Sequence, residues 1–576
     1  MPHRVADELV TRLEEAGVER IYGVVGDSLN PVTDAIRRSG GRLEFIHVRN
    51  EESGAFAAGA EAQLTGKLTA CAGSCGPGNL HLINGLFDSH RSSAPVLAIA
   101  SHIPTSQIGT GFFQETHPEI LFKECSHYCE LVSTPEQMPR VLHLAMQSAV
   151  GKGGVGVVVL PGDVAGMHMP SDDVPRSVLT SRPAVRPCEQ DLTRLADVLN
   201  SAGRVVLFCG AGCADAHDEV VALADRLKAP VGYALRGKSF VAYENPFEVG
   251  MTGLLGYGAA YEAMHECDVL VLLGTNFPYD NFLPTKPKIV QIDIRVEQLG
   301  RRSKLDLGLC GDAGETIRAL LPMLEARTDR SFLEARLEKH RRALHKLNVY
   351  VNHVSKRRPM HPEPVAAALN AIAADDAIFT TDTGMSTVWS ARYIESTRNR
   401  RLIGSFNHGS MANALPQAIG AQLAFPGRQV ISMSGDGGLA MLLGELLTIT
   451  QYDLPIKVLV FDNSALGMVK LEMEVAGLPD FLTDLKNPNF AKLAEAIGIM
   501  GIRIEDPGDV SSGIKKALEH SGPALIDVVT DPNALSKPPH IAADQVTGFG
   551  LAMMKLALSG HVDEVVDTIE GNIRQI

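Results

Sequence analysis

The sequence contains few of the features that mark several large classes of protein. One tryptophan occurs among 576 residues, and aromatic residues make up only 5%. No apolar run approaches the ~18–20 residues that cross a membrane as a helix. Acidic residues outnumber basic ones, 67 to 53, and the net charge of −14 argues against nucleic acid as the main partner, because phosphate backbones require a basic surface. No signal-peptide segment follows Met1, so we expect a cytoplasmic protein.

Cysteine is also scarce, and its number is odd. Nine cysteines argue against a disulfide framework. Six of them form three Cys-x-x-x-Cys pairs, which begin at Cys71, Cys125 and Cys209. A zinc site is an alternative, although structural zinc sites usually have a two-residue gap. We therefore expect reduced, mostly buried thiols.

The chain is too long for a single hydrophobic core. Short apolar strands, such as those at 204–209 and 268–273, alternate with helical patterns. This alternation predicts parallel sheets covered by helices on both faces. We expect an α/β protein with three doubly wound parallel-sheet domains and a C-terminal helical tail. The expected domains are residues 1–180, 190–335 and 360–535, and the tail is 540–576.

The strongest local feature is Asp436 in Ser-Gly-Asp-Gly-Gly, directly after an apolar strand at 428–433. The next strand, 456–461, leads into Asp-Asn-Ser with Asn463, and residues 439–452 have the pattern of one helix. Strands joined in this way are often neighbours, so both polar residues should lie at one sheet edge. A carboxylate and an amide oxygen suit Mg²⁺ with phosphate, and the glycines admit a diphosphate. An aspartate N-cap and an unrelated Asn turn are the alternative.

This pair of segments resembles the Gly-Asp-Gly…Asn-Asn signature of thiamin diphosphate-dependent enzymes. Asp462 stands where the first Asn of that signature usually occurs. The resemblance implies that Asp436, Asn463 and the carbonyl of Ala465 hold Mg²⁺ against the cofactor diphosphate.

A second segment, residues 49–60, resembles the His-Glu-x-x-Ala segment of the same family. The resemblance places on Glu51 the hydrogen bond to the aminopyrimidine ring that helps to turn the thiazolium carbon into a nucleophile. Asn50 replaces the usual His. Two acids that favour a helix N-terminus are the simpler alternative. In the family this glutamate and the diphosphate domain come from different subunits, which implies a homodimer at least and favours a homotetramer.

Further segments fit the same cofactor. Residues 74–79 resemble the loop on the pyrimidine side, and residues 407–412 would supply Met411, the bulky residue that bends the cofactor. The contacts implied by the resemblance are Gly76, Asn79, Gly409, Ser410, Met411, Asp436, Gly437, Gly438, Asn463 and Gly467.

The middle stretch contains a glycine turn, Phe-Cys-Gly-Ala-Gly-Cys at 208–213, after a strand. As a dinucleotide fingerprint it is incomplete, because Asp215 occupies the sixth position. The segments nonetheless resemble the FAD-binding segments of pyruvate oxidases, and a vestigial scaffold without flavin is the alternative. A strand-end carboxylate can accept ribose hydroxyls, and an arginine can bind a diphosphate. The resemblance assigns to FAD Gly210, Gly212, Arg236, Met251, Thr252, Gly253, Leu254, Gly274, Thr275, Asn276 and Asp293.

Across nearly the whole chain the resemblance is strongest to the acetate-forming, quinone-reducing branch of the pyruvate oxidases. It implies oxidative decarboxylation of pyruvate to acetate and CO₂ by way of hydroxyethyl-thiamin diphosphate, with electrons passing through FAD to a membrane quinone. Phe113, Gln114 and Glu472 would line the pyruvate pocket, although a buried Phe and a surface Gln are simpler interpretations of the first two. Met468 stands where that branch has an aromatic residue that enters the active site on activation.

The tail has apolar residues at helical spacing between 548 and 573. An amphipathic helix can lie in a membrane interface, but acidic residues outnumber basic ones here, so charge would not attract it to anionic lipid. A helix docked on its own protein is the alternative. The resemblance favours peripheral association with lipid at the inner face of the cell membrane. Acetolactate synthase, an oxygen- and phosphate-dependent pyruvate oxidase and a non-catalytic nucleotide-binding scaffold are the alternatives for the whole chain.

Overall fold

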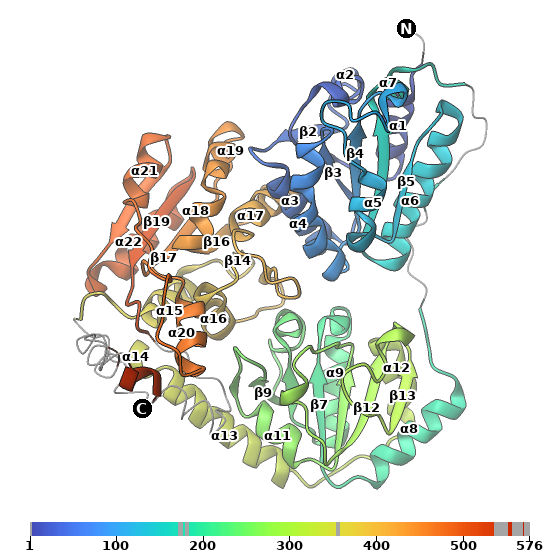
Figure 1. Cartoon of the computed structure of the whole chain (residues 1–576). Coiled ribbons are helices and arrows are strands. Elements are labelled where there is room, and N and C mark those ends of the chain that lie inside the picture. The colour runs from blue at the N-terminus through green and yellow to red at the C-terminus, as the bar shows by residue number, and fades with distance from the viewer. Residues whose placement is uncertain are drawn as a thin grey trace.

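The computed structural model describes residues 3–170, 177–178, 184–352, 357–534, 551–555 and residue 568. Three α/β domains follow one another along the chain, and Figure 1 shows them in blue, green and orange. Each contains a largely parallel sheet with helices against its faces. The predicted fold class is therefore confirmed.

The first domain has a six-stranded parallel sheet in the order β2-β1-β3-β4-β6-β5. Strands β3, β4 and β6 are buried along their whole length, which explains why their sequences show apolar runs and no alternation. The strands are β1 (Arg20–Gly23), β2 (Glu44–His47), β3 (Thr69–Gly73), β4 (Val96–His102), β5 (Tyr128–Leu131) and β6 (Val155–Pro161), and the helices are α1 (Val5–Glu15), α2 (Asn30–Arg38), α3 (Glu51–Thr65), α4 (Pro77–Arg91), α5 (Pro118–Leu121), α6 (Met138–Lys152) and α7 (Gly162–Gly166).

The middle domain has a seven-stranded sheet in the order β10-β9-β8-β7-β11-β12-β13. Its edge strand β10 runs antiparallel to β9. The strands are β7 (Val205–Cys209), β8 (Val231–Tyr233), β9 (Glu248–Met251), β10 (Tyr257–Gly258), β11 (Val269–Leu273), β12 (Lys288–Asp293) and β13 (Leu307–Cys310), and the helices are α8 (Glu189–Ser201), α9 (His217–Leu227), α10 (Lys238–Val241), α11 (Ala260–Glu266) and α12 (Ala313–Leu320).

The third domain has a six-stranded sheet in the order β15-β14-β16-β17-β19-β18. Counted along the chain, this is the strand order of the first domain. Two helices, α13 (Ser331–Leu347) and α14 (Val349–Asn352), precede it. Its strands are β14 (Ile378–Thr381), β15 (Arg401–Gly404), β16 (Val430–Gly435), β17 (Lys457–Asp462), β18 (Met500–Ile504) and β19 (Ala524–Val529), and its helices are α15 (Pro362–Ile372), α16 (Met385–Tyr393), α17 (Ala414–Ala424), α18 (Asp436–Met441), α19 (Leu446–Gln451), α20 (Gly467–Val475), α21 (Phe490–Ala496) and α22 (Val510–Glu519).

The prediction of one helix over residues 439–452 is wrong. Helix α18 ends at Met441, a 3-10 turn (Leu443–Glu445) follows, and α19 begins at Leu446. At this break the side chain of Glu445 is buried, and it accepts hydrogen bonds from backbone N–H groups of the first domain. A contact between domains thus accompanies a break that local periodicity does not reveal.

The first and third domains meet along α3 and α17, which Figure 1 shows side by side. A Cβ atom placed on Gly420 of α17 would lie 2.1 Å from the backbone oxygen of Ala57 in α3. Backbone cannot move aside as a flexible side chain can, so this crossing requires glycine.

We expect Gly420→Ala to lower the stability of the protein by about 1–3 kcal/mol, the usual cost of overpacking. The midpoint of thermal unfolding measures this effect. Gly427→Ala is the matched control, because Gly427 is exposed and a Cβ there meets nothing within 4 Å. Equal midpoints for the two variants would contradict the prediction.

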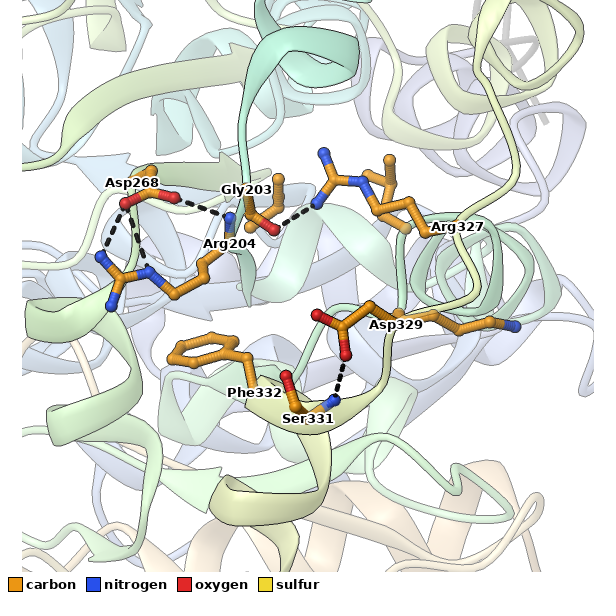
Figure 2. A pocket seen from close by; sticks show the side chains of 10 residues that line it. Gly203, Arg204, Asp268, Arg327, Asp329, Ser331 and Phe332 are labelled. Carbon is orange, nitrogen blue, oxygen red and sulfur yellow. Dashed lines mark hydrogen bonds and ion pairs between the residues drawn. The ribbon is translucent and has the colours of Figure 1, made fainter.

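A cavity of about 470 Å³ lies at the amino-terminal ends of β7 and β11. Figure 2 shows that Arg204, Arg327 and Asp329 each have a partner among the residues drawn. Arg204 pairs with Asp268 at 2.7 Å, and Arg327 donates to the carbonyl oxygen of Gly203 at 3.0 Å. The cavity is lined by the middle domain and by the segment that leads into α13. It lies at the end of the sheet opposite the predicted cofactor residues.

Candidate functional site

All three groups of predicted cofactor residues lie where the strand order of a sheet reverses. In the third domain this point falls between β14, which Asp382 follows, and β16, which Asp436 follows. In the first domain it falls between β1 and β3, next to residues 74–79, and in the middle domain between β7 and β11, next to Gly210 and Gly274. Crevices outside the carboxyl ends of strands at such points are the usual ligand sites of open α/β sheets.

Strands β16 and β17 are neighbours, as predicted, so Asp436 and Asn463 follow adjacent strands at one sheet edge. Strands β16 and β17 pair with Gly435 opposite Phe461. The side-chain nitrogen of Asn487 donates to both carboxylates, to Asp436 Oδ2 at 2.7 Å and to Asp462 Oδ1 at 2.8 Å. Asn487 thus ties the two strand ends together.

The charge of Asp436 has no basic partner in the described part of the chain. Its side chain is 3% exposed, and burial raises the pKa of Asp436 to about 6. Asp462, in contrast, pairs with Arg503 at 3.3 Å. Close by, Asn463 Oδ1 accepts a hydrogen bond from the backbone N–H of Ala465. A buried, uncompensated carboxylate beside an amide oxygen is a donor set that fits Mg²⁺.

Gly438, after β16, leaves no room for a side chain, and Gly437 lies close to Met411. A Cβ on Gly438 would lie 2.4 Å from Asp382 Oδ2, and a Cβ on Gly437 would lie 3.4 Å from Met411 Cε. Asp382 is 1% exposed and accepts a hydrogen bond from the backbone N–H of Ala414. Burial raises the pKa of Asp382 to about 7. Met411 therefore lies next to Gly437, and the carboxylate of Asp382 lies next to Gly438.

Two other predicted glycines also have steric reasons in the third domain. Gly467 begins α20, and a Cβ there would lie 2.8 Å from Asn463 Nδ2. Gly409 has φ +78°, a conformation that side chains disfavour. Next to it, the backbone N–H of Ser410 donates to Ser405 Oγ at 3.0 Å.

Glu51 begins α3 in the first domain and is 7% exposed. Its Oε2 lies 2.9 Å from Nδ1 of His81 on α4, and a Cβ on Gly78 would lie 2.9 Å from its Oε1. Asn50, which replaces the usual His, caps the helix by accepting a hydrogen bond from the Glu52 N–H. The carboxylate therefore lies against Gly78 and His81, at the start of α4.

Asn79 and Gly76 shape the segment of residues 74–79. Asn79 is fully buried and donates to the carbonyl of Ser101 at 2.7 Å, whereas its Oδ1 has no hydrogen-bond partner among the described residues. Gly76 has φ +68°, and a Cβ there would lie 2.9 Å from the Cβ of Gln114. Cys75 Sγ lies 3.2 Å from Gln114 Oε1.

The residues predicted to line a substrate pocket, Phe113, Gln114 and Glu472, do not all lie in one domain. Phe113 is 76% exposed, so the interpretation as a core residue is wrong for the chain as described. Gln114 has φ +62° and packs on Gly76. Met468 and Glu472 lie on α20, and burial, with a smaller contribution from the charge of Glu472, raises the pKa of Tyr279. Among the described residues, no hydrogen bond or ion pair joins Phe113 or Gln114 to Glu472.

The predicted flavin residues gather at the carboxyl ends of β7, β9, β11 and β12. Cβ atoms on Gly210 and Gly212 would lie 2.5 and 2.6 Å from the backbone of Gly274, so the two turns touch backbone to backbone. Thr252 is 3% exposed, and its hydroxyl has no partner among the described residues. An orphaned buried hydroxyl beside a glycine turn fits a bound polar ligand.

Other residues of this group have partners already. Arg236 donates to the carbonyl of Ser92 in the first domain, and burial lowers the pKa of Arg236. Asp293 is 8% exposed and accepts a hydrogen bond from the Arg295 N–H. Of the rest, Met251 and Thr275 are buried, Gly253 has φ +106°, and Leu254 and Asn276 are exposed.

Sequence analysis missed three residues at these sites. Asp382 follows an apolar strand just as Asp436 does, so the same signal could have revealed it. His81 lies four residues inside α4 and Asn487 lies in a loop, and neither has a distinctive local pattern. Both become apparent only from their contacts with Glu51 and Asp436.

Three family models match the chain in the order of its domains. The N-terminal TPP binding domain of thiamine pyrophosphate enzymes matches residues 3–120, the central domain residues 192–320, and the C-terminal TPP binding domain residues 382–528. The chain belongs to the thiamine pyrophosphate enzymes, in which the cofactor is thiamin diphosphate.

Several curated relatives are similar over nearly their whole length. A putative thiamine pyrophosphate-containing protein of Bacillus subtilis, YdaP, is 35% identical over 556 residues, 96% of each chain. The pyruvate oxidase of Lactiplantibacillus plantarum is 32% identical over 529 residues, 90% of this chain and 87% of the relative. A probable acetolactate synthase large subunit of Methanocaldococcus jannaschii is 31% identical over 552 residues, 92% of each chain.

Little of the predicted tail, residues 540–576, is within the described residues. Residues 551–555 are helical, and Lys555 Nζ donates to the carbonyl of Gly477, just beyond α20. In the parts of the chain that the structure describes, no helix is long and apolar enough to cross a membrane.

Proposed function

We propose that this thiamine pyrophosphate enzyme oxidises pyruvate to acetate and CO₂, using FAD and Mg²⁺ and passing electrons to a membrane quinone. The observation that carries the proposal is the uncompensated buried carboxylate of Asp436 beside Asn463, in a chain similar to a pyruvate oxidase over 529 residues. The orphaned hydroxyl of Thr252, which follows β9 at the same sheet edge as the glycine turns after β7 and β11, supports a flavin there.

The residues divide into three groups in this proposal. Asp436, Asn463 and the carbonyl of Ala465 would hold Mg²⁺ and the diphosphate. Phe113, Gln114, Met468 and Glu472 would surround pyruvate once the site is complete. The flavin would contact Gly210, Gly212, Arg236, Met251, Thr252, Gly253, Leu254, Gly274, Thr275, Asn276 and Asp293.

Thiamin diphosphate, when bound, supplies a nucleophilic carbon and accepts the electron pair that departing CO₂ leaves behind. The carboxylate of Glu51 would hold the proton shared with the aminopyrimidine ring, and its low exposure keeps water from competing for that hydrogen bond. Met411 would support the bent cofactor above Gly437. The described contacts of the Glu51 carboxylate lie within its own domain, at His81 and Gly78, so we propose that a partner subunit's third domain completes the site in a homotetramer.

The second candidate is acetolactate synthase, which the similarity to the relative from Methanocaldococcus jannaschii favours. Both reactions begin with decarboxylation, and they differ in what happens to the two remaining electrons. The test mixes purified protein with both cofactors, pyruvate and a soluble quinone analogue in the absence of oxygen. The protein should form one acetate and one quinol for each CO₂ released. Acetolactate with unreduced quinone would show the synthase instead. Formation of hydrogen peroxide and acetyl phosphate when oxygen and phosphate are supplied would show the oxygen- and phosphate-dependent pyruvate oxidase.

Peripheral membrane association belongs to the same proposal. The described part of the tail contacts Gly477, in the segment that follows α20 with Met468 and Glu472, so the tail would either lie on lipid or cover the site. Flotation with lipid vesicles, comparing the full chain with one that ends near residue 539, tests the first possibility. A full-length protein that does not float with vesicles would remove the membrane from the proposal.

A further inference from the structure

The interface between the first and third domains contains a buried carboxylate from each side. Glu445 of the third domain is 1% exposed. Its Oε1 accepts hydrogen bonds from the backbone N–H groups of Arg49 at 2.9 Å and Asn50 at 3.1 Å, and its Oε2 accepts one from the Thr448 hydroxyl. The two N–H groups directly precede Glu51.

Asp88 of α4 makes a contact in the opposite direction, from the first domain to the third. It is 1% exposed, its Oδ1 accepts a hydrogen bond from the Ser405 hydroxyl at 2.8 Å, and its Oδ2 accepts one from the Gln417 side chain at 3.2 Å. The same Ser405 oxygen accepts the backbone N–H of Ser410, which directly precedes Met411. A carboxylate of the first domain therefore holds the segment that carries Met411.

A third polar side chain joins these two segments. Asn84, one turn before Asp88 on α4, donates to Glu52 Oε1 at 2.7 Å and to Ser410 Oγ at 2.9 Å. The residue after Glu51 is thus linked through one amide to the residue before Met411. This link and the two carboxylates connect the two cofactor segments within a single chain.

We propose that Glu445 and Asp88 are positioning residues, each of which fixes across the domain boundary the segment that carries the other domain's cofactor residue. The role at the cofactor rests on the proposed function, whereas the contacts themselves do not. Glu445 suits this task because a carboxylate accepts two N–H groups at once, and hydrogen bonds to charged acceptors are short and strong. Without it, two buried N–H groups would lose their partner, and the start of α3 would gain freedom. Glu51 must keep its direction to share a proton, so this freedom would lower its effectiveness.

The test compares Glu445→Ala with Glu445→Gln. Glutamine retains an oxygen that can accept both N–H groups, whereas alanine retains none. Glu519→Ala is the matched control, because Glu519 is an exposed glutamate on α22 of the same domain. If Glu445→Ala does not fold, Glu445→Asp, which draws the carboxylate back by one methylene, takes its place.

The first measurement uses cofactor-free protein. Amide hydrogen exchange should become faster at residues 49–50 in Glu445→Ala and remain near the wild-type rate in Glu445→Gln. In Asp88→Ala the faster exchange should appear at residues 405–411 and not at 49–50. Unchanged exchange at 49–50 in Glu445→Ala, or equal changes at both segments in both variants, would overturn the proposed contacts. This result does not depend on the reaction the enzyme catalyses.

The second measurement follows deuterium exchange at the thiazolium carbon of bound thiamin diphosphate, without substrate. Glu445→Ala should slow this exchange roughly tenfold with little change in cofactor affinity, and Glu445→Gln should restore most of the rate. A wild-type rate in Glu445→Ala, or an equal loss in the glutamine variant, would overturn the positioning role. If these exchange rates are as expected but the wild type does not reduce quinone, only the proposed function would be overturned.

Discussion

Glu51→Gln should lower the rate of pyruvate decarboxylation by roughly 10²–10⁴-fold, the range that a positioned proton-transfer group contributes, and leave thiamin diphosphate bound. The amide has nearly the size of the carboxylate, so it can remain beside His81 and Gly78. It cannot hold the proton that the aminopyrimidine ring must share. Release of labelled CO₂ from pyruvate measures the rate, and quenching of protein fluorescence on cofactor addition measures binding.

Glu15→Gln is the control for this prediction, because Glu15 is an exposed glutamate of the same domain. Its decarboxylation rate should equal that of the wild type. A Glu51→Gln variant with full activity would remove Glu51 from its proposed role. A variant that has lost the cofactor would show that the carboxylate serves binding and not proton transfer.

Asp436→Asn should weaken the binding of Mg²⁺ and thiamin diphosphate together by roughly 100-fold, because changes around a metal site commonly cost 10–100-fold in affinity and this one removes a charge. The carboxylate is buried and has no basic partner in the described part of the chain. Neutralising it removes the negative charge that would attract a divalent cation. Titration calorimetry with thiamin diphosphate at several fixed Mg²⁺ concentrations measures the effect.

The control is Asp453→Asn in the same domain. Asp453 is exposed and has φ +50°, a conformation that asparagine tolerates well. It should bind both ligands as the wild type does. Equal affinities in the two variants would show that Asp436 is a turn residue, the alternative that the sequence leaves open.

Much of the fold could be predicted from apolar strands, because a strand buried on both faces appears as a continuous run. The strands at 205–209 and 269–273 lie where the sequence indicates them. The residues that follow these strands could be assigned to sheet edges for the same reason. The glycine turns that follow strands indicated the edge of each sheet at which a ligand is expected.

Tertiary contacts account for what the sequence does not reveal. The helix break at Leu442 coincides with the contact of Glu445 to another domain, and local periodicity contains no information on that contact. His81 was missed because its partner Glu51 is 30 residues away. Phe113 and Glu472 belong to different domains, so no local pattern relates the two.

The shared strand order of the first and third domains suggests how this enzyme arose. Two sheets with the same unusual order, second-first-third-fourth-sixth-fifth, are what duplication of one ancestral gene segment would leave. In the proposed function, each copy would use the same crevice to bind a different end of one cofactor. The carboxylates Glu445 and Asp88, which reach across in opposite directions, both lie between the third and fourth strands of their own domain, so on this view they occupy equivalent connections of the repeated unit.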